Sequence, residues 1–357
     1  MHLSDVLKDY LDEIPCFIQR EPTENETDRW VSHQIGNRQY HIALPVTFTP
    51  YASVKSCSAR CHFCSENLRE IHHHQHSSML RPSKSYFSQL TSALEQLRDV
   101  PLSYSLSGLE MTDDLFWFSE LIRVLERHKQ VSRVDQTVLY SNGAGLVDLQ
   151  KNVDLMTTIK QFDISWVELS RHHFNDLENQ KIMRFRSDQR IMKNEHLSNA
   201  IELVGQLSLV KLVCIVQSEG VNDLESLIEY IYWAASLNVK NIIFRELSLL
   251  DNNYKENSTF NYIARTRVSI GELAEKFINR FFSGGSLKIV QATNGYYFCN
   301  LVVDFNGILI TFESSSYIDL KKKHESGKVY KLIFHANGNL CSDWNPDRNI
   351  LFSAAQG

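Results

Sequence analysis

Proline and glycine are scarce in this sequence, with 7 prolines and 14 glycines among 357 residues. This excludes collagen-like, linker-dominated and disordered chains. Positive charge is not in excess, because 37 Lys and Arg stand against 42 Asp and Glu, which argues against a nucleic-acid partner. No apolar run approaches the roughly 18 residues of a membrane span, since the best one, 207–216, is split by Lys211. We therefore expect a globular protein without a nucleic-acid or membrane partner.

Cysteine is also scarce, and its count of seven is odd. The N-terminal segment is acidic and amphipathic, without the basic-then-apolar layout of a signal peptide. An odd number of cysteines in a long chain without an export signal does not indicate a disulfide framework, so we expect a cytoplasmic location. Cys57, Cys61 and Cys64 fall within eight residues, and this clustering is the first sign of function.

Apolar, strand-like runs alternate with segments of helical periodicity between residues 41 and 250. Helices are predicted at 85–97, 112–126, 147–160, 195–207 and 223–237. Strands are predicted at 41–49, 102–107, 134–140, 162–169, 208–216 and 239–246. This alternation predicts a parallel sheet with right-handed crossovers. Six units are fewer than the eight of a closed barrel, so the predicted fold class is α/β, a partial (β/α)6 TIM-like barrel.

The pattern changes after residue 258 and divides the chain into three parts. Residues 1–40 are predicted to be an N-terminal extension, 41–258 the barrel, and 259–357 a small appended α+β region that covers the barrel mouth. In the last part we expect a helix near 268–281 and short strands joined by tight turns at Asn306-Gly307 and Asn337-Gly338. Three consecutive lysines, 321–323, are assigned to a polar surface hairpin.

The cysteine triplet has two interpretations. A zinc site would use the three thiolates with His62 or a histidine of the run 72–76 as fourth ligand, in a non-enzymatic interaction module. Structural zinc sites usually pair two short hooks, however, and this triplet is one hook. Three thiolates suit a [4Fe–4S] cluster better, because they leave one iron open for an external ligand. After the first strand of a parallel barrel, such a loop lies at the mouth where these folds keep their chemistry.

The spacing Cys57-x3-Cys61-x2-Cys64, with Phe63 before the last cysteine, resembles the signature of the radical S-adenosylmethionine superfamily. The resemblance implies a partial barrel and a cluster whose open iron is chelated by S-adenosylmethionine, with Phe63 beside the cofactor. It also implies reductive cleavage of this cofactor to a 5′-deoxyadenosyl radical that abstracts hydrogen from a substrate. An electron donor such as flavodoxin or ferredoxin is implied as a partner.

Later segments resemble other parts of the same family. Ser107-Gly108-Leu109-Glu110 keeps one glycine and the glutamate of a Gly-Gly-Glu-Pro run, which implies that Gly108 and Glu110 lie at the methionyl amino group. A carboxylate favoured at a helix start is the other interpretation of Glu110. The remaining cofactor contacts implied by the resemblance are Ser141 and Asn142 after the third strand, and Ser170 and Arg171 after the fourth.

Arg245 lies within an apolar strand and needs a partner there. The resemblance offers the cofactor carboxylate, and an ion pair with Glu246 or Glu168 is equally suitable. Glu168 shares a strand face with Ser170, so it could face substrate inside the barrel or form a salt bridge outside.

The other cysteines decide the number of clusters. Cys299 and Cys341 are 42 residues apart, and no second hook follows the barrel, so one cluster is expected. Buried thiol is the default for both, although they and Glu168 are the candidates for a catalytic side chain. The first choice of substrate is a small polar metabolite, such as a sugar, amino acid or nucleoside in a biosynthetic pathway, and a peptide or protein under maturation is the second.

Overall fold

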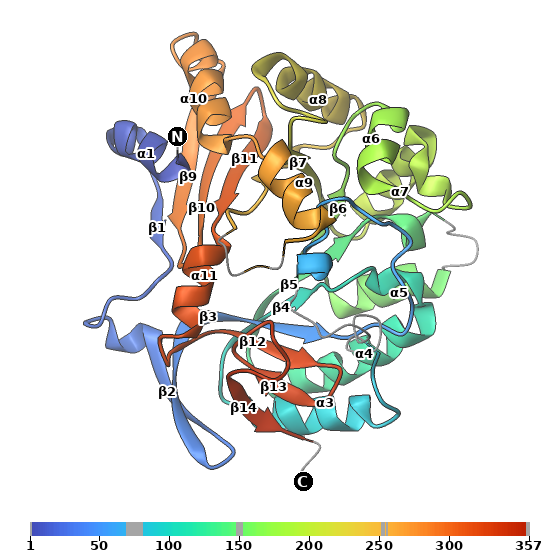
Figure 1. Ribbon diagram of the computed structural model, residues 1–357, viewed down its shortest axis with the longest axis vertical. Helices are drawn as coiled ribbons and strands as arrows, with labels where there is room; N and C mark the ends of the chain where they lie inside the picture. The colour runs from blue at the N-terminus through green and yellow to red at the C-terminus, as the bar shows by residue number, and fades with distance from the viewer. Residues whose placement is uncertain (1, 69–80, 148–152, 251–253, 255, 355–357) are drawn as a thin grey trace.

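The computed structural model describes residues 2–68, 81–147, 153–250, 254 and 256–354. Its strands are β1 (Phe17–Gln19), β2 (Trp30–Ile35), β3 (Arg38–Tyr51), β4 (Leu102–Leu106), β5 (Val134–Ser141), β6 (Trp166–Ser170), β7 (Leu209–Val216), β8 (Asn241–Glu246), β9 (Leu287–Asn294), β10 (Phe298–Phe305), β11 (Ile308–Ser315), β12 (Val329–His335), β13 (Asn339–Cys341) and β14 (Ile350–Ser353). All of them join one sheet, in the order β1-β9-β10-β11-β8-β7-β6-β5-β4-β3-β12-β13-β14, with β2 paired to β3 (Figure 1).

Six consecutive strands, β3 to β8, form the parallel centre of this sheet. The predicted α/β class and partial barrel are thereby confirmed. Figure 1 shows helices around the outside of these strands. They are α3 (Tyr86–Glu95), α4 (Leu115–Lys129), α5 (Val153–Phe162), α6 (Asp176–Met183), α7 (Asn194–Gly205) and α8 (Leu224–Ser236).

Local sequence explains where these helices begin and which face they bury. The carboxylate of Asp114 accepts a hydrogen bond from the Trp117 amide at 3.0 Å, which caps α4. Asp223 and Ser226 form a capping box at the start of α8. Phe118 and Leu125 of α4 recur at helical spacing and are fully buried against the sheet. The apolar core of the protein therefore lies between the outer face of the sheet and these helices.

The C-terminal third extends the barrel sheet at both edges, which differs from the expected appended cover. β11 pairs in parallel with β8, and β10 and β9 follow in antiparallel pairing. At the opposite edge β12 pairs in parallel with β3, and β13 and β14 follow. Pairings between segments this distant in sequence leave no local signal, so the position of these strands could not be predicted. The tight turns at Asn306-Gly307 and Asn337-Gly338 are confirmed, with Gly307 and Gly338 at φ of 84° and 83°.

The N-terminal residues also join the sheet. β1 pairs in parallel with β9 at one edge, and β2 pairs with β3. The helix α1 (Leu3–Asp9) lies beside α10 (Ile270–Phe281), where the Tyr10 hydroxyl donates to Asn279 Oδ1 at 2.9 Å (Figure 1).

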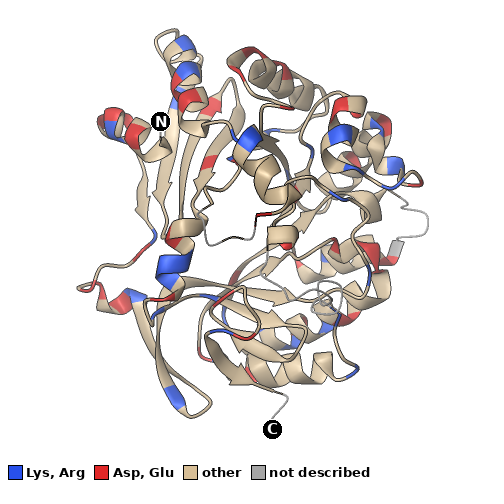
Figure 2. Ribbon diagram, viewed as in Figure 1, with Lys and Arg blue, Asp and Glu red and all other residues tan. Residues whose placement is uncertain are grey.

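The remaining helices cover the C-terminal strands and one end of the barrel. The three lysines 321–323 lie in a helix, α11, and not in a hairpin, because Ser316 caps the segment and the lysines occupy its last turn. Figure 2 shows charged residues of both signs mixed over the outer helices. None of the helices in the described part of the chain is long and apolar enough to cross a membrane. These further helices are α9 (Ser258–Thr266), α11 (Tyr317–His324) and the short turns η1 (Leu11–Glu13), η2 (Thr27–Arg29), η3 (Ser65–Leu68), η4 (Met111–Asp113), η5 (Ala144–Leu146) and η6 (Arg190–Met192).

Candidate active site

The inner face of the sheet encloses a cavity of about 730 Å³. Its lining follows the two-residue period of the strands. Ser103, Ser105 and Ser107 lie along β4 and its end, and Glu168 and Arg245 come from β6 and β8. Because the apolar residues between them face the outer helices, the same strands make a core on one side and a polar cavity on the other.

The cysteine loop follows β3 at one end of this cavity. Backbone hydrogen bonds hold it against the C-terminal end of α6: the Arg60 amide donates to Met183 O at 3.0 Å, and the His62 amide donates to Ile182 O at 3.3 Å. Cys61 and Cys64 line the cavity. The structure thus brings two of the three thiols to the end of the barrel where the sequence predicts them.

The environment of the sulfur atoms suits an iron–sulfur cluster. Cys57 Sγ accepts hydrogen bonds from the Ala59 amide and from Asn142 Nδ2, both at 3.4 Å. Burial raises the pKa of the Cys57 thiol to about 12, and it raises that of Cys61 as well. Nearby negative charge, from Glu110 at Cys57 and from the other cysteines, acts in the same direction. Three such thiolates need a bound cation to offset desolvation and mutual repulsion, and a cluster supplies one.

Of the histidines considered as a fourth zinc ligand, the structure describes only His62. The His62 ring stacks on Tyr262, with the ring centroids 4.8 Å apart. The histidine run 72–76 lies outside the described residues. Among the residues that are described, no three His, Cys, Asp or Glu side chains gather around one point as the ligands of a single metal ion would. A cluster does not require this, because each thiolate binds its own iron.

Phe63 is the aromatic residue of the cysteine motif, and it lines the cavity between Cys61 and Cys64. Its ring meets the buried His172 edge to face, with the centroids 4.9 Å apart. His172 Nδ1 in turn accepts a hydrogen bond from the Ile215 amide at 3.1 Å, and burial lowers the pKa of this imidazole to about 3. Sequence analysis did not single out His172, which holds the cysteine loop against β7.

Glu110 ties together the loops that follow β4 and β5. Its buried carboxylate accepts hydrogen bonds from Thr112 Oγ1 at 2.5 Å, Ser141 Oγ at 2.9 Å and the Asn142 amide at 2.5 Å. Burial raises the pKa of this carboxyl to about 7, against the lowering effect of these donors. Of the two interpretations from sequence, the carboxylate at a helix start is present, because Glu110 caps η4. The contact of Glu110 with the methionyl amino group stays a prediction.

Ser141 and Asn142 extend this network to the cysteine loop. The Asn142 side chain donates to Ser58 Oγ at 2.9 Å in addition to Cys57 Sγ. Asp113 accepts from the Ser58 amide at 2.7 Å. Hydrogen bonds therefore link the three loops that follow β3, β4 and β5. From the sequence, these loops could be related only by their order along the chain.

Gly108 fills a position that only glycine fits. Its φ is 113°, and an added Cβ would lie 2.7 Å from the ring of Tyr51. This close approach lets the segment after β4 cross the end of β3. The cofactor contact expected for Gly108 stays a prediction, and the structure adds a packing reason for the residue.

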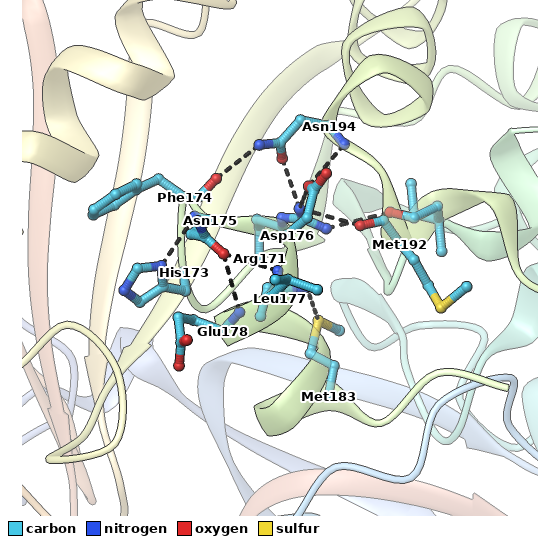
Figure 3. A network of polar contacts seen from close by, with 12 residues as sticks. Arg171, His173, Phe174, Asn175, Asp176, Leu177, Glu178, Met183, Met192 and Asn194 are labelled. Atoms are coloured by element: carbon cyan, nitrogen blue, oxygen red, sulfur yellow. Dashed lines mark hydrogen bonds and ion pairs between the residues drawn. The ribbon is translucent and has the colours of Figure 1, made fainter. Parts of the chain in front are cut away.

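Arg171 directly follows β6, and its side chain lies in the polar network that Figure 3 shows. It is 1% exposed. Its guanidinium donates to Asp176 and Asn194, both at 2.6 Å, and to the Ile191 carbonyl at 3.3 Å. Arg171 is absent from the residues that line the cavity. The expectation that it binds a cofactor carboxylate is therefore corrected to a structural role, because a carboxylate of the chain already occupies its fork.

Ser170, on the same strand, is half-buried and pairs with Val213 of β7. The lining of the cavity on β6 ends with Glu168, two residues earlier. Its proposed contact with the cofactor stays a prediction.

Arg245 forms ion pairs with two carboxylates inside the cavity. Its Nη2 lies 3.2 Å from Glu168 Oε2, and its Nε donates to Glu313 Oε1. Of the partners considered from sequence, Glu168 is present and Glu246 is not, because Glu246 pairs with Arg267. Glu168 also accepts from Trp166 Nε1 at 3.2 Å. It faces the cavity, and its salt bridge with Arg245 lies inside the barrel and not outside. A role of Glu168 toward the substrate stays a prediction.

Neither candidate thiol outside the barrel reaches the cavity. Phe298, Asn300 and Val302 of β10 line it, and Cys299 lies on the opposite face of that strand because side chains alternate. Cys341 is fully buried at the far edge of the sheet, where its thiol lies 3.6 Å from Pro346 O. The expectation that one of these thiols serves the reaction is corrected by their positions.

Several cavity residues come from the C-terminal strands and were missed in the sequence. The most notable are Glu313 of β11 and Lys331 of β12, with Tyr296, Tyr297 and Trp344 beside them. One signal was available: polar residues at every second position, Thr311, Glu313 and Ser315, mark a strand with a polar inner face.

Comparisons with known proteins identify the fold. No protein-family model and no curated protein sequence matches the chain. A structure of anSMEcpe with bound AdoMet aligns with 87% of this chain and 78% of its own, at a TM-score of 0.52 and 15% identity. SuiB of Streptococcus suis, bound to S-adenosylmethionine, aligns with 88% of this chain and 65% of its own, at a TM-score of 0.51 and 14% identity. The chain has the fold of radical S-adenosylmethionine enzymes, so the resemblance of the cysteine motif is confirmed at the level of the fold.

Proposed function

We propose that this chain is a radical S-adenosylmethionine enzyme that acts on a small polar metabolite. One observation carries the proposal. The loop with Cys57, Cys61 and Cys64 ends the first barrel strand, and Cys61 and Cys64 face a cavity whose walls carry hydroxyl and charged side chains. A cluster held there would share the cavity with the substrate.

The three cysteines would hold one [4Fe–4S] cluster. With S-adenosylmethionine bound, this group would supply the electron transfer and the hydrogen-abstracting radical of the superfamily. Asn142 would stabilise negative charge on Cys57 through its hydrogen bond to Sγ. Glu110 and Ser141 are positioning residues, because they act on Asn142 and its loop.

A separate reductant would supply the electron. Exposed cations surround the outer side of the cysteine loop: Lys55, Arg60, Arg184 and Arg186. Positive charge of this kind steers an acidic electron carrier, such as a flavodoxin or a ferredoxin, towards the loop.

The size and polarity of the cavity support a small substrate. Its volume of about 730 Å³ falls in the range of small-molecule sites. The Arg245 ion pairs fix Glu168 and Glu313 in the wall, where their free carboxylate lone pairs can accept hydrogen bonds from substrate hydroxyl or amino groups. Maturation of a peptide is the competing function, and the experiment below separates the two.

The test uses protein purified and reconstituted with iron and sulfide under anaerobic conditions. We expect about four iron atoms per chain, and 5′-deoxyadenosine after addition of dithionite and S-adenosylmethionine. The triple variant Cys57→Ala, Cys61→Ala, Cys64→Ala should retain no iron, and Cys16→Ala, which removes an exposed thiol, should behave like the parent.

Two results would contradict parts of the proposal. A colourless protein that keeps zinc would replace the enzyme by the zinc-binding module. If peptides and not small polar metabolites accelerate 5′-deoxyadenosine formation, the reaction class stands and the substrate class is peptide.

A further inference from the structure

Lys331 is a buried cation that has no carboxylate partner among the residues that the structure describes. It lies on β12, is 8% exposed and lines the cavity. Throughout the described ranges, no hydrogen bond or ion pair of its ammonium group is found, and burial lowers its pKa to about 8. The nearby Asp343 carboxylate is engaged elsewhere, since it accepts from the Asn345 amide at 2.9 Å and lies 3.6 Å from His324 Nδ1.

Aromatic rings surround this ammonium group. Its Nζ lies 4.4 Å from the ring centroid of Trp344 and 5.8 Å from that of Tyr297. Cation–π contacts stabilise the charge only in part, because three N–H donors still need acceptors. Arg245, in the same cavity, has two carboxylates. The comparison indicates that the acceptor for Lys331 is not part of the chain that the structure describes.

A second cation lines the same cavity, and the ring of Tyr296 beside it lies 5.1 Å from that of Tyr330, the neighbour of Lys331 on β12. Arg20, just after β1, lines it beside Tyr296. Its guanidinium makes no hydrogen bond or ion pair with the other residues described, and burial lowers its pKa. Arg20 follows the edge strand β1, and Lys331 lies on β12 on the other side of the central strands. The fold thus brings to one cavity two cations that have no carboxylate partner among the described residues.

Neutral polar side chains continue the wall from Lys331 across three strands. In the register of the sheet, Lys331 stands beside Thr47, Thr47 beside Ser103, and Ser103 beside Gln136. All four line the cavity. A cation followed by hydroxyl and amide groups matches a ligand with an anionic group at one end and hydroxyl or amino groups along its length.

We propose that Lys331 and Arg20 form an anion-binding end of the substrate cavity, which selects small polar metabolites with a carboxylate or phosphate group. Thr47, Ser103 and Gln136 then accept and donate hydrogen bonds along the rest of the molecule. The inference deepens the proposed function by naming the substrate class. The binding itself does not depend on a cluster.

The test measures binding of three matched probes to the full chain by ligand-observed NMR titration: glycerol 3-phosphate, glycerate and uncharged glycerol. Both anions, or the one whose chemistry the site prefers, should bind the parent, and glycerol should not. Lys331→Met should weaken anion binding at least roughly tenfold, the usual effect of losing a hydrogen bond to a charged group. Lys331→Arg should keep most of it. Lys322→Met removes an exposed lysine of α11 and is the matched control.

The outcomes separate this inference from the proposed function. The triple cysteine variant should bind the probes like the parent, so a failure of the cluster chemistry leaves this result unaffected. Equal binding of the anions and glycerol to the parent, or an unchanged affinity in Lys331→Met, overturns the inference. Lys331→Met should also be at least as stable as the parent. A variant that fails to fold would mean that Lys331 has a structural partner, and would overturn the inference as well.

Discussion

Two sets of polar side chains at the cavity differ in whether other residues of the chain supply their hydrogen-bond partners. At the cysteine end, Glu110, Asn142 and Asp113 are each satisfied by hydrogen bonds from neighbouring loops. On the cavity wall, the side chains of Lys331 and Arg20 have no hydrogen-bond acceptor and no carboxylate partner among the described residues, and Lys331 has only aromatic rings beside it. A satisfied network is rigid and holds a fixed group in place, whereas unpaired buried charge costs stability and is retained where a ligand neutralises it.

The Arg245 ion pairs share one property with each set of residues. It joins two carboxylates to one guanidinium, so it is charged and yet internally paired. The predictions that follow change one region at a time, so that each region's part in binding or stability is measured by itself.

The largest effect is expected at the cysteine loop. Cys61→Ala should abolish iron retention after anaerobic reconstitution, because three thiolates are the minimum set for the cluster. Cys299→Ala is the matched control, since its thiol is buried on the face of β10 away from the cavity. Iron analysis of both proteins makes the comparison. Equal loss of iron in the two variants would place Cys299 in the cluster site and contradict the structure.

The central ion pairs should show the next largest effect. Arg245→Met leaves Glu168 and Glu313 facing each other, and should lower the free energy of unfolding by roughly 3 kcal/mol, as breaking a buried pair does. The double variant Arg245→Met, Glu313→Gln should recover part of this loss. Denaturant titrations of cluster-free protein measure both. If the double variant is less stable than the single one, the carboxylates are not the source of the effect.

Glu110 tests the satisfied network. Glu110→Ala removes the acceptor of four donors, two of them on Thr112, and should cost about 2 kcal/mol in the free energy of unfolding. The exposed Glu219, paired with Arg265, is the control, and Glu219→Ala should change stability by less than about 0.5 kcal/mol. The same denaturant titration applies. Equal effects of the two substitutions would show that the loops are held together without Glu110.

The smallest effect is a gain in stability at Lys331. Burial lowers the pKa of this lysine to about 8, from the ordinary lysine value of 10.5. Its ammonium form therefore destabilises the folded state below pH 8, and this cost fades as the pH rises from 8 to 10.5. Lys331→Met should stabilise the ligand-free protein by about 1 kcal/mol at pH 7, and the difference should shrink towards pH 10. A difference that grows with pH would mean that the pKa is raised.

Much of the barrel could be predicted from the sequence, because the information is local. The predicted strand at 134–140 lies within β5, and that at 208–216 covers β7. The second is largely apolar over its whole length, the first ends in the apolar run Val138-Leu139-Tyr140, and a helical stripe follows each. The cysteine triplet was visible for the same reason, since its ligands are neighbours in the chain.

The chemistry of single polar residues could not be predicted in this way. Arg171 follows its strand as a cofactor ligand would, but Asp176 and Asn194 occupy its guanidinium. Lys331 looked like any lysine in a mixed sequence. Whether a charge is paired depends on what the fold brings within about 4 Å, and sequence spacing does not contain that distance for residues on different strands.

The sequence by itself determined the six parallel strands, five of the six outer helices and the cysteine loop, because hydrophobic period and short motifs are properties of neighbouring residues. The short helix α6 was not predicted. The tertiary structure decided that the N- and C-terminal segments widen the same sheet at both edges. It also decided that Arg20, Glu313 and Lys331 face one cavity with the barrel strands. These are contacts between segments far apart in the chain, and their pairing is selected by the packing of the whole sheet.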